Sequence, residues 1–157
     1  LYRTALLSTY GFAITPERRL EYQSLRHFEY RTAIAETQFL HDPASRDGDI
    51  FVFGNPIAYH FARRNQAIPQ QGWSIKVYLP EQWAEIERRL QSSQPAYVFV
   101  AANKQEQLEH RCGRVLNLLK KNYQIVRQSS HGTWHELMDE TTDSAPVIAS
   151  RTAAAIT

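Results

Sequence analysis

The residues best placed to bind a ligand follow short hydrophobic runs that predict β-strands. Gly54 and Asn55 come directly after the run at residues 50–53, and Asn103 comes shortly after the run at residues 96–101. Open α/β sheets bind ligands at the carboxyl ends of their strands, where loop backbone and helix N-termini gather. We therefore expect any ligand site to lie there, and it would comprise Gly54, Asn55, Tyr59, Trp73 and Asn103.

The segment Gly54-Asn55-Pro56 also fits a purely structural turn between a strand and a helix. It lacks the Gly-x-Gly-x-x-Gly spacing of a dinucleotide-binding turn, and Pro56 has no amide N–H to offer to a phosphate. A structural turn is therefore the first interpretation, and a site for a small polar ligand or a partner protein is the second.

Residue types that perform catalysis are present, but their spacing does not bring them together. Asp47 and Asp49 precede a predicted strand, which is the wrong end for the nucleophile of an aspartate-based phosphatase. His131 and His135 are four residues apart across a predicted turn and strand, where that spacing does not converge on a metal as it would on a helix. No Gly-x-Ser-x-Gly sequence occurs. We predict no catalytic residue and no metal site in this chain.

Aromatic residues allow two interpretations. Their spacing on predicted strands and on one helix face favours a hydrophobic core, but aromatic rings can also stack against sugars. Trp73 and Tyr78, beside a loop, are the best candidates for exposed rings. The aromatic residues considered for sugar stacking are Trp73, Tyr78, Trp83, Tyr97 and Phe99.

Composition indicates one folded domain with no nucleic-acid partner. The chain has 157 residues, of which 43% are hydrophobic and 22% charged, values typical of a globular domain. Its net charge of +2 is near neutral, and its basic residues form no block longer than a pair. The one cysteine, Cys112, excludes an internal disulfide. No segment approaches the roughly 20 apolar residues that span a bilayer.

Five segments have the pattern of β-strands. Residues 50–53 and 96–101 are continuous apolar runs, which are typical of strands covered on both faces. Residues 73–79 alternate between apolar and polar side chains and predict a strand nearer a sheet edge. Residues 123–128 and 133–137 flank a glycine-containing turn and predict an antiparallel hairpin.

Helical spacing of apolar residues predicts helices at residues 16–40, 56–64, 80–93 and 103–121. Strands and helices therefore alternate along most of the chain, which favours parallel strands joined by helical crossovers. The predicted fold is an α/β, three-layer, Rossmann-like sheet that is mostly parallel, with a terminal antiparallel hairpin and a long N-terminal helix.

The predicted domain covers residues 16–140. Residues 1–15 are expected to be a juxtamembrane segment or docked arm, and residues 141–157, rich in Ala, Thr and Ser, a flexible tail. The chain begins at Leu1 without an initiator methionine, so we expect it to be a piece of a longer protein.

The order of these segments resembles a known family. It is similar to the soluble, extracytoplasmic C-terminal domain of polytopic membrane glycosyltransferases of the dolichyl-phosphate-mannose–protein mannosyltransferase (GT-C) type. The likeness covers residues 16–137. The matching motifs are Gly48-Asp49-Ile50-Phe51-Val52-Phe53-Gly54, Tyr59, Pro95-Ala96-Tyr97-Val98-Phe99-Val100 and Tyr123-Gln124-Ile125-Val126.

This resemblance implies a non-catalytic domain on the extracytoplasmic face of a membrane. Its parent would transfer sugar from a polyprenyl-phosphate donor, with or without a divalent cation, and the fragment itself would hold no cofactor. The implied role is accessory: recognition of a glycan or protein acceptor, or docking to a partner, which includes the transmembrane module of the same polypeptide. The alternative is a free-standing cytoplasmic α/β ligand-binding or regulatory domain.

Overall fold

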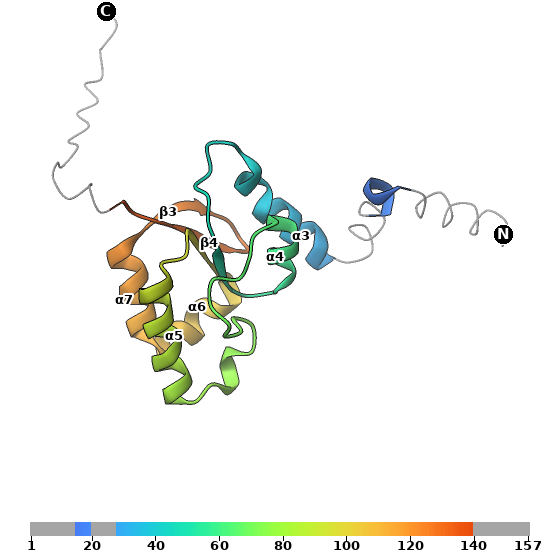
Figure 1. Cartoon of the computed structure of the whole chain (residues 1–157). Coiled ribbons are helices and arrows are strands. Elements are labelled where there is room, and N and C mark those ends of the chain that lie inside the picture. Colours follow the sequence, from blue (N-terminus) through green and yellow to red (C-terminus); the bar gives the residue numbers. More distant parts are fainter. Residues whose placement is uncertain (1–14, 20–27, 140–157) are drawn as a thin grey trace, which may run out of the picture.

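A computed structural model describes residues 15–19 and 28–139. Residues 28–139 form a mixed four-stranded sheet in the order β1-β2-β4-β3, with helices on both of its faces (Figure 1). The strands are β1 (Ile50–Phe53), β2 (Tyr97–Ala101), β3 (Tyr123–Gln128) and β4 (Gly132–Leu137).

The two continuous apolar runs form the parallel pair of the sheet, in which β2 is a central strand and β1 is an edge strand. β1 and β2 pair in parallel, with Ile50 opposite Tyr97 and Phe53 opposite Val100. All four residues of β1 and the first four of β2 are buried. The prediction of parallel strands covered on both faces is confirmed for these two segments, which are also neighbours in the sheet.

The predicted hairpin is also present. β3 and β4 pair antiparallel, and β4 lies between β3 and β2, with Trp134 opposite Phe99. β3 is therefore an edge strand, and most of its side chains are exposed.

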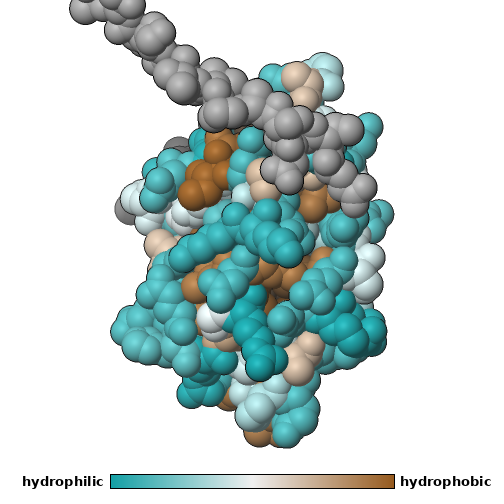
Figure 2. Space-filling model, turned by 90° about the vertical axis from the view of Figure 1, so that its left-hand side faces the viewer, coloured by the Kyte–Doolittle hydropathy of each residue, from teal (hydrophilic) through white to brown (hydrophobic). Residues whose placement is uncertain are grey.

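One face of the sheet is covered by α5 (Pro80–Ser93), α6 (Ala102–Arg111) and α7 (Gly113–Asn122). The helix predicted over residues 80–93 is confirmed, and its helically spaced apolar residues Trp83, Ile86 and Leu90 are all buried. The outer surface on the side of α5 and α7 is mainly hydrophilic, with hydrophobic atoms visible in a central furrow (Figure 2).

The opposite face is covered by α3 (Phe28–Thr37), the 3₁₀-helix η1 (Gln38–His41) and α4 (Ile57–Ala62). These elements offer smaller side chains to the sheet. Ala58 and Ala62 of α4 and Leu40 of η1 pack with Val52, Phe99 and Trp134.

The prediction of a mostly parallel, Rossmann-like sheet is wrong. One pair of strands is parallel and the other two pairs are antiparallel. The predicted strand at residues 73–79 does not form. Its place holds a 3₁₀-helix, η2 (Ile75–Val77), in which Ile75 is buried whereas Val77 is 75% exposed.

A loop occupies the edge of β1 where another strand could have paired. The amide of Ile50 donates to the carbonyl of Asn65 at 3.0 Å, and the amide of Ala67 donates to the carbonyl of Ile50 at 2.9 Å. Farther along, a side chain on Gly72 would place its Cβ 1.7 Å from the carbonyl oxygen of Val52. Glycine lets the loop lie against β1 and close the sheet on this side.

The prediction of one long N-terminal α-helix over residues 16–40 is also wrong. Residues 16–19 are helical, residues 20–27 lie outside the described part of the chain, and α3 ends at Thr37, where the backbone tightens into η1. The hydroxyl of Thr37 donates to the carbonyl of Ala33 at 2.8 Å. Such side-chain bonds compete with regular helix geometry.

The helix predicted over residues 103–121 is divided into α6 and α7 at Cys112. This residue has φ −150° and ψ 64°, far from helical values, and its side chain is buried. The break turns α7 so that Val115, Leu116, Leu118 and Leu119 all face the core. The periodic pattern was correct, but it did not reveal the change of direction.

The segments predicted as an arm (1–15) and a flexible tail (141–157) lie outside the described residues, apart from Thr15. Within residues 15–19 and 28–139, no helix has both the length and the hydrophobicity to cross a bilayer.

Candidate ligand-binding site

A cavity of about 340 Å³ opens between α3 and the ends of β1 and β2. Small side chains create this space, because Ala33 of α3, Ala58 of α4 and Ala101 of β2 line its walls. The turn between β3 and β4 contributes Ser130 and His131. This volume lies at the lower end of the range for ligand pockets and suits a small molecule.

The inner wall comes from the face of α3 that is turned towards the sheet. Ala33, Glu36, Thr37 and Leu40 are buried and recur at helical spacing across α3 and η1. The sequence spacing of Phe28, Thr32, Ala35 and Phe39 predicts that these residues form the apolar face of the helix, but Phe28 is 69% exposed and Ala35 is exposed as well. The helix is therefore rotated relative to that expectation, and the rotation brings a carboxylate to the cavity.

Glu36 is this carboxylate. Glu36 is 4% exposed, and its Oε2 atom has no hydrogen-bond partner within the described residues. The nearest cation is Arg127 of β3, whose Nε lies 3.9 Å from Oε2. At that distance the guanidinium of Arg127 offsets the charge of the Glu36 carboxylate, but the two atoms are too far apart for a hydrogen bond. Arg127 instead donates through Nη2 to the carbonyl of Ala35 at 3.2 Å.

The floor of the cavity is aromatic. Trp134 of β4 is fully buried and stacks in a tilted arrangement on Phe99 of β2, with their ring centroids 4.8 Å apart. The indole Nε1 of Trp134 also lacks an acceptor within the described residues. Two of the residues that line the cavity therefore carry a polar atom without a hydrogen-bond partner among the described residues, but both atoms are buried within the protein.

Polar groups and two rings form the mouth of the cavity. The side-chain amide of Asn55 donates to Glu29 Oε2 at 3.0 Å. The side-chain carbonyl oxygen of Asn55 accepts from the backbone amide of Ile57 at 3.0 Å, where α4 begins. Across the opening, Phe28 and His131 meet edge to face at 5.9 Å. The mouth thus links α3, the end of β1 and the β3–β4 turn.

The structure brings together two of the five residues predicted for the site, Asn55 and Asn103, both of which line the cavity. Asn103 lies inside α6 and is not its cap, since Ala101 occupies that position. Gly54 is buried between the strand ends, where a Cβ would lie 3.0 Å from the Cβ of Ala101. Its role there is close packing.

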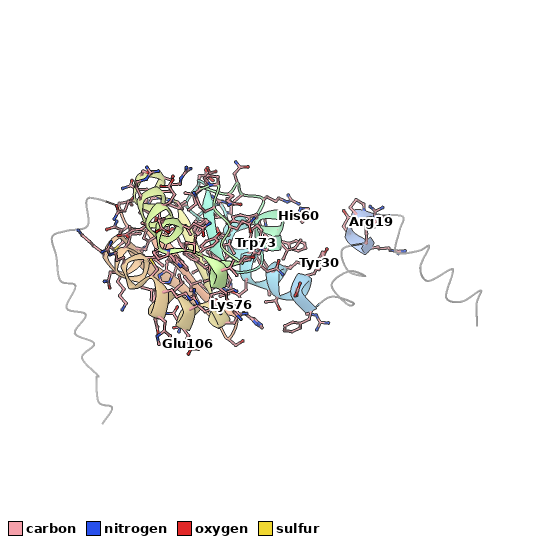
Figure 3. The ribbon with its side chains drawn as sticks, turned by 90° about the horizontal axis from the view of Figure 1, so that it is seen from below. Arg19, Tyr30, His60, Trp73, Lys76 and Glu106 are labelled. Atoms are coloured by element: carbon pink, nitrogen blue, oxygen red, sulfur yellow. The ribbon has the colours of Figure 1, made fainter. Side chains whose placement is uncertain are left out.

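Tyr59 and Trp73 have structural roles away from the cavity. The hydroxyl of Tyr59 accepts a hydrogen bond from the amide of Val52 at 2.9 Å, and burial raises its pKa to about 12. The carbonyl of Trp73 accepts from Nζ of Lys104 at 2.9 Å. The view from below labels Trp73, in the segment before η2, and Tyr30 on α3 (Figure 3).

Sequence reasoning missed the residues that give the cavity its chemical character. A signal for Glu36 was present, because Ala33, Glu36, Thr37 and Leu40 follow the i, i+3, i+4, i+7 spacing of a buried helix face. A search weighted towards large apolar residues selects the neighbouring stripe instead. The other missed lining residues with polar or aromatic side chains are Phe28, Glu29, Thr32, Phe99, Ser130, His131 and Trp134.

Within the described ranges, no group of three or more His, Cys, Asp or Glu side chains could hold a metal ion. The aspartates and histidines considered for catalysis do not meet: Asp47 lies in the loop before β1 near Arg64, whereas His135 lies on β4 beneath α7. No family model matches the chain, and neither a curated protein nor a solved structure matches it at a significant level.

Proposed function

We propose that this chain is the non-catalytic soluble domain of a membrane glycosyltransferase that uses a lipid-phosphate sugar donor. In this proposal the domain lies on the extracytoplasmic face of the membrane and assists recognition of a glycan or protein acceptor. The order of the sequence motifs supports the family, and the cavity between α3 and the strand ends supports the recognition role.

The observation that supports acceptor recognition best is the chemistry of the cavity. Sugars combine apolar ring faces with hydroxyl groups that both donate and accept hydrogen bonds. Aromatic surfaces next to a few polar groups match such ligands. Here Phe28 supplies an exposed ring, and Asn55 and Asn103 supply exposed polar groups in the lining of the same cavity.

The accessory role is supported by the composition of the cavity. Transfer from a lipid phosphate requires a base near the acceptor and a cation or hydrogen-bond donors to stabilise the leaving phosphate. Among the described residues that line the cavity there are two glutamates but no lysine or arginine. We therefore assign the chemical step to the rest of the parent enzyme.

Binding to the intact 157-residue chain tests the recognition role. Amide chemical shifts should be followed while monosaccharides, nucleotide sugars and polyprenyl-phosphate analogues are added in turn. We expect a saccharide to shift the amides of Asn55, Ala101 and His131. The matched control region is the second cavity near Arg46 and Asp139, at the other end of the sheet, which should not respond.

Two results would overturn the proposal. One is the absence of any saccharide-induced shift at the cavity. The other is sugar transfer by the isolated chain that disappears when residues of this chain alone are substituted, because such an activity would make the domain an enzyme.

A further inference from the structure

The two edges of the sheet are closed to different degrees. At the β1 edge, the loop over residues 65–72 forms backbone hydrogen bonds with Ile50, and Gly72 lies against Val52. At the opposite edge, β3 has no strand beyond it among the described residues. An edge strand presents a row of unpaired backbone N–H and C=O groups, with which another extended chain can pair. The sheet can therefore accept a further strand at β3.

Exposed apolar side chains accompany this open edge. Ile125 is 61% exposed and Val126 is 41% exposed, and both are β-branched residues in the middle of β3. Ile125 also lines a cavity of about 440 Å³ between α7 and the β3–β4 hairpin, together with Leu116 and Leu119 of α7. A strand added to β3 would thus find an apolar pocket beside its backbone partners. Such pockets give strand addition its specificity for side chains.

The surface beside β3 is basic. Residues 111–128 contain five basic residues and no acidic residue. Lys120 and Lys121 are exposed at the end of α7, which lies beside β3 (Figure 1), and within the described residues neither forms an ion pair. Lys120 lines the cavity, and the described lining residues include no aspartate or glutamate. Carboxylates of a partner would gain charge-assisted hydrogen bonds from these lysines.

A second copy of this chain fits the β3 edge poorly. Antiparallel pairing of two β3 strands would place both α7 helices on the same side of the joint sheet, and juxtaposed like charges disfavour such a complex. The register of β3 also shifts between Ile125 and Arg127, which indicates a bulge. Bulges increase the local twist and hinder the association of two rigid sheet edges. A short flexible peptide can follow this twist.

We propose that the groove formed by β3 and α7 binds an extended peptide segment in which aliphatic residues are flanked by Asp or Glu. The peptide pairs with β3 as a further strand, one aliphatic side chain contacts Ile125 at the cavity, and its carboxylates accept hydrogen bonds from Lys120 and Lys121. The groove lies on the α7 side of the sheet, whereas the cavity proposed for saccharides lies on the α3 side. This inference is therefore independent of the proposed function.

Three synthetic peptides test the proposal by NMR titration of the intact 157-residue chain at low ionic strength. The probe is acetyl-Glu-Glu-Val-Ile-Val-Glu-Glu-amide. One control replaces its four glutamates with lysines, and the other replaces its central isoleucine with proline. We expect the probe to bind about 10-fold more tightly than either control, because lysines repel the basic surface and proline cannot donate to a neighbouring strand. No binding of the probe, or affinity equal to that of either control, would overturn the proposal.

Amide hydrogen exchange distinguishes strand pairing from attraction between charges alone. At saturation, the probe should slow exchange at alternate residues of β3, because new backbone hydrogen bonds protect the amides that make them. The amides of Asn55 and His131, at the mouth of the other cavity, should keep their exchange rates. Binding of the probe without protection of β3 would show that no strand is added.

Two exposed residues of the groove can be substituted without disturbing the core. Lys120→Glu should weaken binding of the probe about 10-fold through charge reversal, and Lys76→Glu is its matched control, because Lys76 is exposed on η2 outside the groove (Figure 3). Ile125→Thr keeps the β-branch and removes apolar surface, and it should weaken binding several-fold. Its control is Val77→Thr on η2. Unchanged affinity in both groove variants would contradict the assignment of the groove.

Other occupants give different results. Vesicles of phosphatidylcholine and phosphatidylglycerol that bind the chain but not Lys120→Glu, together with no protection of β3 by the probe, would assign the basic surface to a membrane and overturn the proposal. The saccharide titration is a separate readout. If the probe protects β3 and no saccharide shifts the α3-side cavity, the proposed function is wrong and the peptide groove remains; the reverse result removes the groove and leaves saccharide recognition.

Discussion

The two faces of the sheet are built by different rules. On the side of α5, α6 and α7, large aliphatic and aromatic side chains interlock over Val98 and Val100. On the side of α3 and α4, alanines replace large side chains, and a carboxylate lies next to a fully buried tryptophan. The first face is filled mainly by large apolar side chains, although a cavity of about 440 Å³ borders it between α7 and the β3–β4 hairpin. The second face receives smaller side chains from α3 and α4 and borders the cavity at the strand ends.

The largest effect should come from Val98→Asp on the densely packed face. Val98 is fully buried in the central strand β2 and packs among the aliphatic cluster. An unpaired carboxylate there should cost about 4 kcal/mol or more, a large part of the total stability of a small domain. Urea denaturation should show a chain that is largely unfolded without denaturant. Val126→Asp, at a partly exposed position of the edge strand β3, is the matched control and should change stability little.

A second comparison substitutes one residue on each face. Leu119→Ala on α7 should cost about 2–5 kcal/mol, because it leaves a cavity among large neighbours. Ala58→Val on α4 adds two methyl groups next to existing space and should cost less than about 1.5 kcal/mol. Both values come from urea denaturation curves. Similar losses for the two variants would show that the faces do not differ in packing.

The same contrast explains which parts of the fold could be predicted from sequence. Residues 50–53 and 96–101 were correctly predicted as buried strands because continuous apolar runs of that length have few other stable arrangements, although β1 lies at the edge of the sheet. The prediction of a strand at residues 73–79 failed because a segment with alternating apolar and polar residues forms a strand only where a neighbouring strand has an unpaired edge. The loop over residues 65–72 already occupies the edge of β1.

The candidate site was predicted in part for a comparable reason. The rule that ligands bind at strand ends identified Asn55 and Asn103, which follow directly from topology. It could not identify Glu36, because the inward face of α3 depends on how the helix rotates against Phe99 and Trp134. Tyr59 and Trp73 lie at the right point in the sequence, but the Tyr59 hydroxyl accepts from the amide of Val52, and the backbone carbonyl of Trp73 accepts from Nζ of Lys104.

The third prediction concerns the stability cost of the open face. Glu36→Met replaces the buried carboxylate with an apolar side chain of similar length. Replacing a buried charge by a well-packed apolar group is often neutral or stabilising, and Arg127, at 40% side-chain exposure, can still be hydrated. We expect the free energy of unfolding to be unchanged or to increase by about 1 kcal/mol, measured by urea denaturation at pH 7. A loss above about 2 kcal/mol would show that Glu36 serves the fold itself.

The smallest expected effect concerns a histidine on the densely packed face. His135 of β4 lies between Val98 and Ile125 in the sheet register and lines a cavity with Leu116 and Leu119 of α7. Burial lowers its pKa below the usual value of 6.5, because the charged imidazolium loses hydration there. The folded chain therefore holds this side chain neutral at pH values where the unfolded chain begins to protonate it.

The sign of the pH dependence follows from this shift. Between the folded pKa of His135 and 6.5, the unfolded state binds more protons, so stability increases with pH across that window. The contribution is complete above about pH 6.5 and is lost as the pH falls through the folded pKa. His135→Gln should therefore flatten this part of the stability curve, whereas His110→Gln on the exposed surface of α6 should retain the wild-type slope. An NMR titration that places the pKa of His135 at or above 6.5 would show that polar space extends to the α7 side as well, and the contrast between the two faces would then fail at β4.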